Sequence, residues 1–129
     1  MSGSVWIAIG AVLAGLGVAA GAIGAHVLKE TLKVEPSVLE TYETAVRYQI
    51  YHALALIVVG LLAARGSSGL LNATGILFAL GIVLFSGGIY AWLATGVRPF
   101  IMVVPVGGSA WILAWLMLAV AALTTRAPA

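Results

Sequence analysis

Two histidines and three neighbouring tyrosines are the side chains best suited to chemistry in this mostly apolar chain. His26 follows one long apolar run, and His52 lies inside another, one turn after Tyr48. Imidazole changes charge near neutral pH, so it can move a proton or bind a metal ion. Ionisable groups at membrane depth are costly and tend to mark function or an internal partner. The candidate polar cluster consists of His26, Glu43, Arg47, Tyr48, Tyr51, His52 and Arg98.

Three hypotheses compete for this cluster. The favoured one is structural, because arginine and tyrosine at a membrane interface usually anchor helix ends. The second is a site for a small molecule, a lipid headgroup or a proton. The third is a metal or haem site on His26 and His52, but two histidines on separate segments of a chain without cysteine are a weak metal signal. We therefore predict no metal and no cofactor.

Catalysis finds little support in the sequence. Ser86 and Ser109 have no visible base in their own segments, and the chain has no aspartate. Glu40 and Glu43 are spaced as on a solvated helix face. No phosphate loop or dinucleotide fingerprint occurs. We predict that the protein is not an enzyme. The net charge of +2 comes from only six basic and four acidic residues, so no basic patch indicates nucleic-acid binding.

The amino-acid composition indicates the class of protein whose helices must position the cluster. Hydrophobic residues make up 63% of the 129 residues, charged residues 8%, and the mean hydropathy is +1.17. Soluble domains are about 45–50% apolar and about 25% charged. A chain this short has too much surface to bury so large a proportion of apolar residues away from water. The sequence therefore predicts an integral membrane protein. Without cysteine it can form no disulfide.

Four transmembrane spans are expected. A span needs about 20 apolar residues, and lipid forces the backbone into a helix. The first run has no preceding Lys or Arg, so we interpret it as a retained span, not a signal peptide. The expected spans are about 4–27, 45–64, 70–95 and 105–124, with a polar loop and interfacial helix start at 28–44.

The second helix is expected to begin at Pro36 and to stop at Gly66. Its polar start would then lie outside the membrane or along the interface. Glu43 and Arg47 have the spacing of a helical ion pair. Tyr42, Tyr48 and Tyr51 would form an interfacial belt. The predicted fold class is all-α, a polytopic protein with four transmembrane helices in a compact bundle, the second extended beyond the membrane.

Two further features concern the helices. We favour residues 97–104 as a connector before a helix from Pro105; the alternative is one helix kinked at Pro105. Small residues recur at helical spacing, which lets helices approach closely in lipid. Packing within the same bundle is the favoured interpretation, and a subunit interface is the alternative. The glycines expected at such contacts are Gly10, Gly17, Gly21, Gly24, Gly87, Gly107 and Gly108.

Orientation follows from the basic residues. One side of the membrane would carry Lys29, Lys33, Arg47 and Arg98, and the other Arg65 and Arg126. The positive-inside rule then places the loop 28–44 in the cytoplasm and both termini outside.

Several motifs resemble a known family. They are Gly21-Ala-Ile-Gly-Ala-His26, Glu43-Thr-Ala-Val-Arg-Tyr-Gln-Ile-Tyr-His-Ala-Leu-Ala-Leu56, Phe85-Ser-Gly87 with Tyr90, and Pro105-Val-Gly-Gly108. Together they resemble the YgdD-like family, small four-helix membrane proteins grouped under a domain of unknown function. The resemblance covers essentially the whole chain and implies a bacterial inner membrane, but no activity. The chain departs from the family pattern at Val104, where a capping Thr is usual, and at Gly88, where a second Ser is frequent.

The sequence thus predicts an inner-membrane protein in contact with lipids. Its favoured role is a structural, self-associating or accessory subunit, as a homo-oligomer or within a larger membrane complex. The alternative is a small carrier or channel, or a lipid- or small-molecule-binding protein that uses the polar cluster. A pore should show a polar stripe through a span, and the middles of three spans offer only Thr74 and Ser86.

Overall fold

The computed structural model describes residues 1–124, and within them the chain is helical throughout, without strands. Four helical units are each long and apolar enough to cross a membrane. The all-α, four-span prediction is confirmed. In chain order the elements are α1 (Gly3–Ile23) with the π-helical η1 (Gly24–Thr31); α2 (Pro36–Arg65); α3 (Gly69–Gly81), the π-helical η2 (Ile82–Gly87) and α4 (Gly88–Thr95); then α5 (Arg98–Met102) and α6 (Val104–Thr124).

Local chemistry explains where the helices begin and end. Pro36 occupies the first turn of α2, where its missing N–H costs nothing. The hydroxyl of Ser68 caps α3 by accepting from the backbone N–H of Leu71 at 3.1 Å. Gly96 ends α4 with φ of 69°, a conformation that glycine adopts without strain. The predicted start and stop of the second helix are both confirmed.

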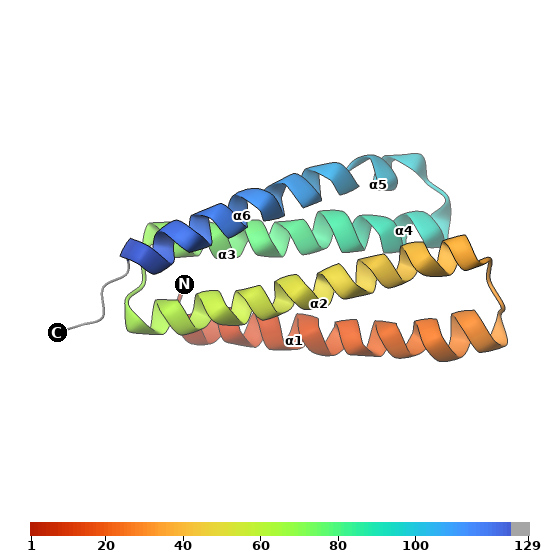
Figure 1. Cartoon of the computed structure of the whole chain (residues 1–129), viewed down its shortest axis with the longest axis horizontal. Helices are drawn as coiled ribbons and strands as arrows, with labels where there is room; N and C mark the ends of the chain where they lie inside the picture. Colours follow the sequence, from red (N-terminus) through yellow and green to blue (C-terminus); the bar gives the residue numbers. More distant parts are fainter. Residues whose placement is uncertain (125–129) are drawn as a thin grey trace.

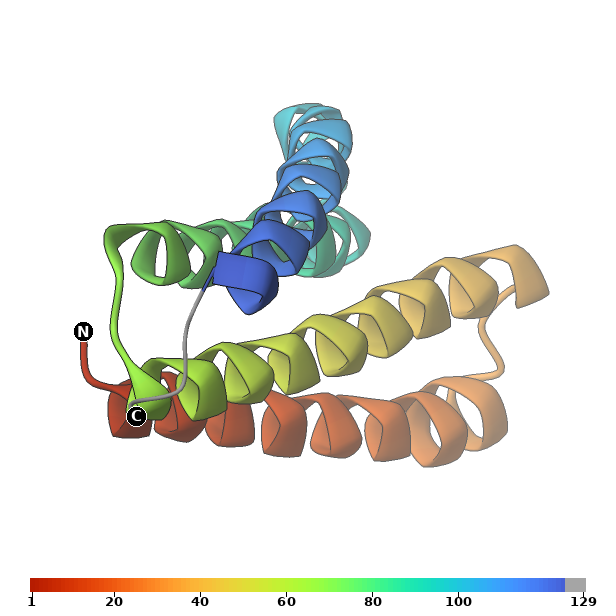
Figure 2. The ribbon, with the colours of Figure 1, turned by 60° about the vertical axis from the view of Figure 1, so that its left-hand side comes forward.

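The helices form two antiparallel pairs (Figure 1). α1 packs almost entirely on α2, and α6 packs on α3 and η2. α2 joins the pairs by packing on α3 and η2, and it meets α6 through side chains such as His52 against Trp111. Figure 2 shows α1 and α2 as one layer, with α3 lying above it and α6 rising away at an angle. α2 is therefore central: 50% of the residues in its apolar stretch are buried, against 17% in α1.

Glycines allow α1 and α2 to approach closely. A Cβ added to Gly3 or Gly60 would lie within 2.6 Å of a carbonyl oxygen of the facing helix, and one added to Gly10 would lie 2.6 Å from the oxygen of Ala53. Gly17 and Gly24 meet Ile50 and Tyr42 in the same way. The small-residue face of the first span is thus used for packing inside the chain.

The other glycines divide into two groups. A Cβ at Gly107 would lie 2.6 Å from the backbone nitrogen of Phe85, and Gly81 lies against Trp111. In contrast, Gly21, Gly87 and Gly108 would meet nothing closer than 3.5 Å. These three positions have room for a methyl group, so packing there does not require glycine. Gly21 still packs on α2, since its added Cβ would lie in ordinary contact with Val46.

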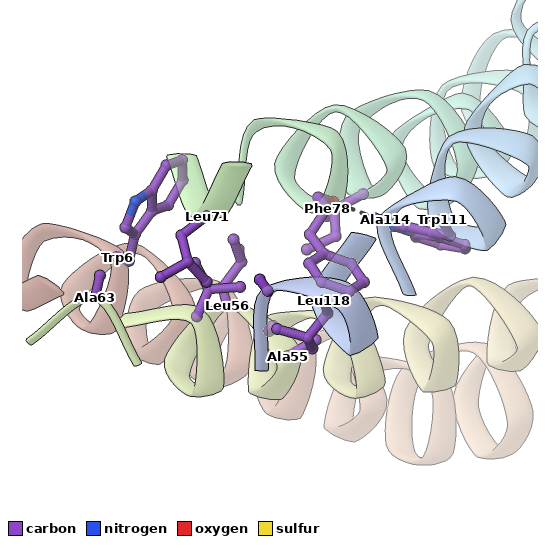
Figure 3. Packing of buried hydrophobic residues seen from close by; sticks show 13 residues of the cluster. Trp6, Ala55, Leu56, Ala63, Leu71, Phe78, Trp111, Ala114 and Leu118 are labelled. Carbon is purple, nitrogen blue, oxygen red and sulfur yellow. Dashed lines mark hydrogen bonds between the residues drawn. The ribbon is translucent and has the colours of Figure 1, made fainter. Parts of the chain in front are cut away.

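The hydrophobic core lies where α2, α3 and α6 meet (Figure 3). Leu56, Phe78 and Ala114 are fully buried there. Trp6 from α1 closes one end of the core beside Ala63 and Leu71. Because lipid tails are as apolar as these side chains, close packing and hydrogen bonds must hold the helices together.

The segment after α4 differs from the favoured prediction of a connector over residues 97–104. Residues 98–102 form α5, and only Val103 separates this turn from α6. The N–H groups of Val106 and Gly107 both reach the carbonyl of Val103, which continues the helix past the break. The arrangement is therefore nearer to the kinked helix. The physical cause is Pro105, which has no N–H to donate to the preceding turn.

Candidate functional site

The expected polar cluster does not form as one group. His26 lies on η1 with its side chain 74% exposed, and its Nδ1 is 3.8 Å from Oε2 of Glu30. Since Gly24 packs against Tyr42, His26 is level with the start of α2. His52 lies ten residues beyond Tyr42 on that helix, or about 15 Å at 1.5 Å per residue. The two histidines do not meet.

The charged members of the cluster are exposed. Arg47 donates to the hydroxyl of Thr44 at 3.3 Å, and within residues 1–124 no ion pair joins it to Glu43. Solvated ion pairs at helical spacing gain little and lose side-chain entropy. Arg98 starts α5 at the end of the molecule that also carries the loop before Pro36 (Figure 1). The basic residues of the described chain thus divide between the two ends as predicted, and Arg126 lies outside the described residues.

Tyr48, Tyr51 and His52 do come together, around a residue that the sequence did not single out. The His52 ring lies parallel to the indole of Trp111, with 3.6 Å between centroids and 2° between planes. Tyr48 packs 5.3 Å from Phe85 and 5.9 Å from Trp111. Tyr51 meets the edge of Tyr48 at 5.8 Å. Aromatic pairs at such separations are attractive beyond their buried area.

These rings enclose one side of a pocket of about 370 Å³. We name it the aromatic pocket. It lies between α2, η2 and α6 and is lined by Tyr48, His52, Phe85, Gly108, Trp111, Ile112 and Trp115. Trp111 is held in place by its own hydrogen bond, from Nε1 to the carbonyl of Phe78 at 3.2 Å (Figure 3).

A second set of polar side chains, absent from the predicted cluster, links the helices near the middle of α2. The amide of Gln49 donates from Nε2 to the carbonyl of Leu13 on α1 at 2.9 Å. Its Oε1 accepts the hydroxyl of Tyr90 from α4 at 2.9 Å. Ser86 on η2 donates to the carbonyl of Ala45 at 2.7 Å. These bonds join three helical units through one stretch of α2.

Tyr42 belongs to this set instead of the expected interfacial belt. Its hydroxyl donates to the carbonyl of Ala20 at 2.7 Å, and its ring lies 5.5 Å from that of Tyr90. The small Gly24 makes room for the ring beside α1. One sequence signal pointed to the set: a glutamine inside an apolar span needs a partner, because lipid supplies none.

A cavity lies where the two helix pairs separate, beside Tyr42 and Tyr90. It measures about 430 Å³, and we name it the loop-end cavity. Both tyrosine hydroxyls are already bonded within the chain, so the rings present apolar surface. The cavity is lined by Ala20, Leu28, Val34, Val38, Tyr42, Tyr90, Leu93 and Ala94.

The donor set of the described residues offers little to a metal ion. Within residues 1–124 no three His, Asp or Glu side chains come close enough to hold one. His52 has aromatic neighbours, and His26 has a single carboxylate beside it. The chemistry available in both cavities is apolar contact, aromatic stacking and a few hydrogen bonds.

Comparison with known proteins places these features in a family context. Residues 20–108 match the family described as "Protein of unknown function (DUF423)", a stretch that includes His52, Gln49, Tyr90 and all of the loop-end cavity. The UPF0382 membrane protein YwdK of Bacillus subtilis is 42% identical over 92% of this chain and 95% of its own length. A UPF0382 membrane protein of Staphylococcus epidermidis is 40% identical over the same shares. No solved structure matches the chain.

Proposed function

The chain belongs to the DUF423 family of proteins of unknown function and is an integral membrane protein, and from this premise we propose that it binds a lipid-like molecule between its two helix pairs. The observation that carries the proposal is the loop-end cavity of about 430 Å³. Ligand pockets in proteins measure about 300–1,000 Å³ and are mostly apolar. The cavity is within this range and draws its lining from α1, η1, α2 and α4.

The lining favours a hydrocarbon chain over a polar solute. The side chains are aliphatic apart from two tyrosines, whose hydroxyls are bonded to Ala20 and Gln49. Both hydroxyls use their proton in these bonds, so the side chains of the lining offer a ligand no hydrogen-bond donor. A polar group that accepts hydrogen bonds would lose its bonds to water there without replacement. An acyl or isoprenoid chain has no such cost. Its polar head would remain at the loop end of the molecule, where Lys29 and Lys33 are exposed.

The test is photo-crosslinking in lipid nanodiscs with a phospholipid that carries a diazirine in its acyl chain. We expect crosslinked peptides from the cavity lining, around Leu28, Val34 and Val38. Ala94 lines the cavity from α4 and is itself exposed. Ala94→Phe should therefore fill the cavity without disturbing the core, and crosslinks to these three residues should disappear.

The matched control is Ala22→Phe, the same change at an exposed position of α1 outside the cavity lining. It should leave the crosslinks unchanged. Crosslinks spread evenly over the outer faces of α1 and α6, and identical in both variants, would mean that the lipid only surrounds the protein. The proposal would then be wrong.

An accessory subunit is the second candidate. The outer helices favour it, since only 17% of the apolar stretch of α1 and 28% of that of the α5–α6 unit are buried within the chain. Such faces can be covered by lipid or by a partner. Self-association has less support, because Gly10 and Gly17 are already used against α2. Native mass spectrometry from nanodiscs separates the cases: a monomer with bound lipid favours the cavity, and a retained partner or second copy favours the subunit.

We also propose that the protein lies in a bacterial inner membrane with the loop between η1 and α2 in the cytoplasm. Lys29 precedes that loop, Lys33 lies in it, and Arg98 lies at the same end of the molecule. The end formed by the α2–α3 turn carries Arg65. The excess of basic residues at the end with the η1–α2 loop supports this orientation, because the positive-inside rule places the more basic side in the cytoplasm.

A further inference from the structure

His52 brings a buried polar side chain into the lining of the aromatic pocket. His52 is 4% exposed, and its Nδ1 is 2.6 Å from the carbonyl oxygen of Tyr48. A carbonyl oxygen only accepts, so Nδ1 carries the proton. In a neutral imidazole the second nitrogen, Nε2, is then a bare acceptor. Nε2 is also the ring nitrogen farther from the α2 backbone.

Nε2 faces open space. Within residues 1–124 no hydrogen bond reaches it, while every fully enclosed side-chain nitrogen or oxygen has a partner. Nε2 is therefore not enclosed, and the open volume that His52 borders is the aromatic pocket. The indole stacked on His52 is that of Trp111, and its Nε1 already donates to the carbonyl of Phe78. The pocket thus combines aromatic walls with one free acceptor on a buried side chain. The Tyr48 hydroxyl and the Trp115 indole N–H also line it, on side chains that are 41% and 46% exposed.

We propose that the aromatic pocket binds a lipophilic hydroquinone or a similar phenol, whose hydroxyl donates to Nε2 of His52. The ligand ring would pack among the aromatic side chains that line the pocket, on the side of Phe85 and Trp115. Rings of this kind prefer offset or edge-to-face contact with aromatic neighbours. This site is separate from the loop-end cavity, which is lined by other residues.

The free acceptor Nε2 of His52 favours some classes of ligand over others. A hydrocarbon chain would fill the pocket but leave Nε2 without a partner in lipid, which is costly. A quinone presents only carbonyl oxygens, which would face the lone pair of Nε2. A cation would be attracted by the rings, but no carboxylate lines the pocket. A phenolic O–H satisfies both the rings and the acceptor, so the reduced form of such a ligand binds and its oxidised form is disfavoured.

The experiment compares three probes that differ at one group: a decyl para-hydroquinone, its para-benzoquinone and its dimethyl ether. Binding to the protein in nanodiscs is measured by tryptophan fluorescence, since Trp111 and Trp115 line the pocket. Dithionite keeps the hydroquinone reduced and leaves a chain without cysteine unaltered. We expect the hydroquinone to bind about tenfold more tightly than either other probe, as for one lost hydrogen bond.

Two variants locate the binding. Gly108→Leu places a side chain in the pocket; its first carbon would lie 3.8 Å from Phe85, an ordinary contact. This variant should lose the fluorescence change that each of the three probes causes by binding in the pocket. Any change that remains measures probe that is dissolved in the bilayer. His52→Phe keeps a ring against Trp111 and removes the acceptor. It should bind the three probes alike, while Tyr51→Phe, an exposed control on the same helix, should keep the preference.

Equal affinity of the wild-type protein for the hydroquinone and its dimethyl ether would overturn the proposal. So would a preference that persists in His52→Phe, or a hydroquinone signal that Gly108→Leu does not reduce. If His52→Phe fails to fold, the comparison with the dimethyl ether tests the same hydrogen bond on the unaltered protein. None of these outcomes depends on lipid in the loop-end cavity.

Discussion

Tyr90 donates its hydroxyl to Oε1 of Gln49 at 2.9 Å, and the same amide donates from Nε2 to the carbonyl of Leu13. One glutamine therefore connects α4, α2 and α1 inside an apolar bundle. α1 and α4 have few direct contacts, so this amide is a principal link between the two helix pairs at that level.

Removing either partner of this link should destabilise the protein. Gln49→Leu loses both bonds and leaves the Tyr90 hydroxyl unpaired, at a cost of about 1–3 kcal/mol in the free energy of unfolding. Tyr90→Phe should cost less. A double-mutant cycle measured by steric trapping in bicelles should give a coupling of about 0.6–1.7 kcal/mol, the range for hydrogen bonds between membrane helices. A coupling of zero would show that the bond contributes nothing.

The glycines of the α1–α2 contact should not tolerate a methyl group. Gly10→Ala would place Cβ 2.6 Å from the oxygen of Ala53, so the helices must separate, at about 1–3 kcal/mol. Gly15→Ala is the matched control on the same helix, because nothing lies within 4 Å of its added Cβ. Chemical unfolding in detergent should show the loss for Gly10→Ala alone. Equal effects of the two changes would contradict close packing as the cause.

The His52–Trp111 stack should depend on the glycine behind it. Gly81 lies directly against the indole of Trp111, so the Cβ of Gly81→Ala would displace the ring and break its bond to Phe78. We expect a changed near-ultraviolet circular dichroism signal and a red-shifted tryptophan emission with the helical content retained. Gly69→Ala, which meets nothing within 4 Å, should leave both spectra as they are.

The proposed orientation can be read directly with single cysteines, because the chain has none of its own. Glu35→Cys lies in the loop between η1 and α2, and Ser67→Cys in the turn between α2 and α3. In intact cells a membrane-impermeant maleimide should label Ser67→Cys, and label Glu35→Cys only after permeabilisation. The reverse pattern would invert the orientation and place the loop outside.

Helix positions could be predicted from the sequence because length and hydropathy alone determine which segments can cross lipid. Pro36 and Gly66 delimit the second helix by local chemistry, without reference to the rest of the fold. The internal use of the first-span glycines also followed from spacing, since small residues at helical intervals need a close neighbour.

The site could be predicted only in part, because its contacts join distant segments. His52 was identified as the deepest ionisable residue, but its partner Trp111 lies 59 positions later, on a helix whose rotation the sequence does not reveal. The sequence grouped His26 with His52 in one cluster but could not show whether they meet, because the level of α1 against α2 is determined by contacts such as Gly24 with Tyr42. Those contacts set the levels of the two helices and keep the histidines apart.

The π-helical turn η2 has a consequence for how the third span can change through evolution. A π turn holds one residue more than an α-helical turn, and one residue corresponds to about 100° of rotation at 3.6 residues per turn. The span therefore changes the face it presents between α3 and α4, and after Ile82 Ser86 and Tyr90 reach α2. A single-residue deletion between 82 and 87 would leave an unbroken helix of nearly the same length. It would nevertheless turn Tyr90 away from Gln49. In this segment selection must therefore preserve the number of residues, which sets the rotation of the helix about its axis, more than their composition.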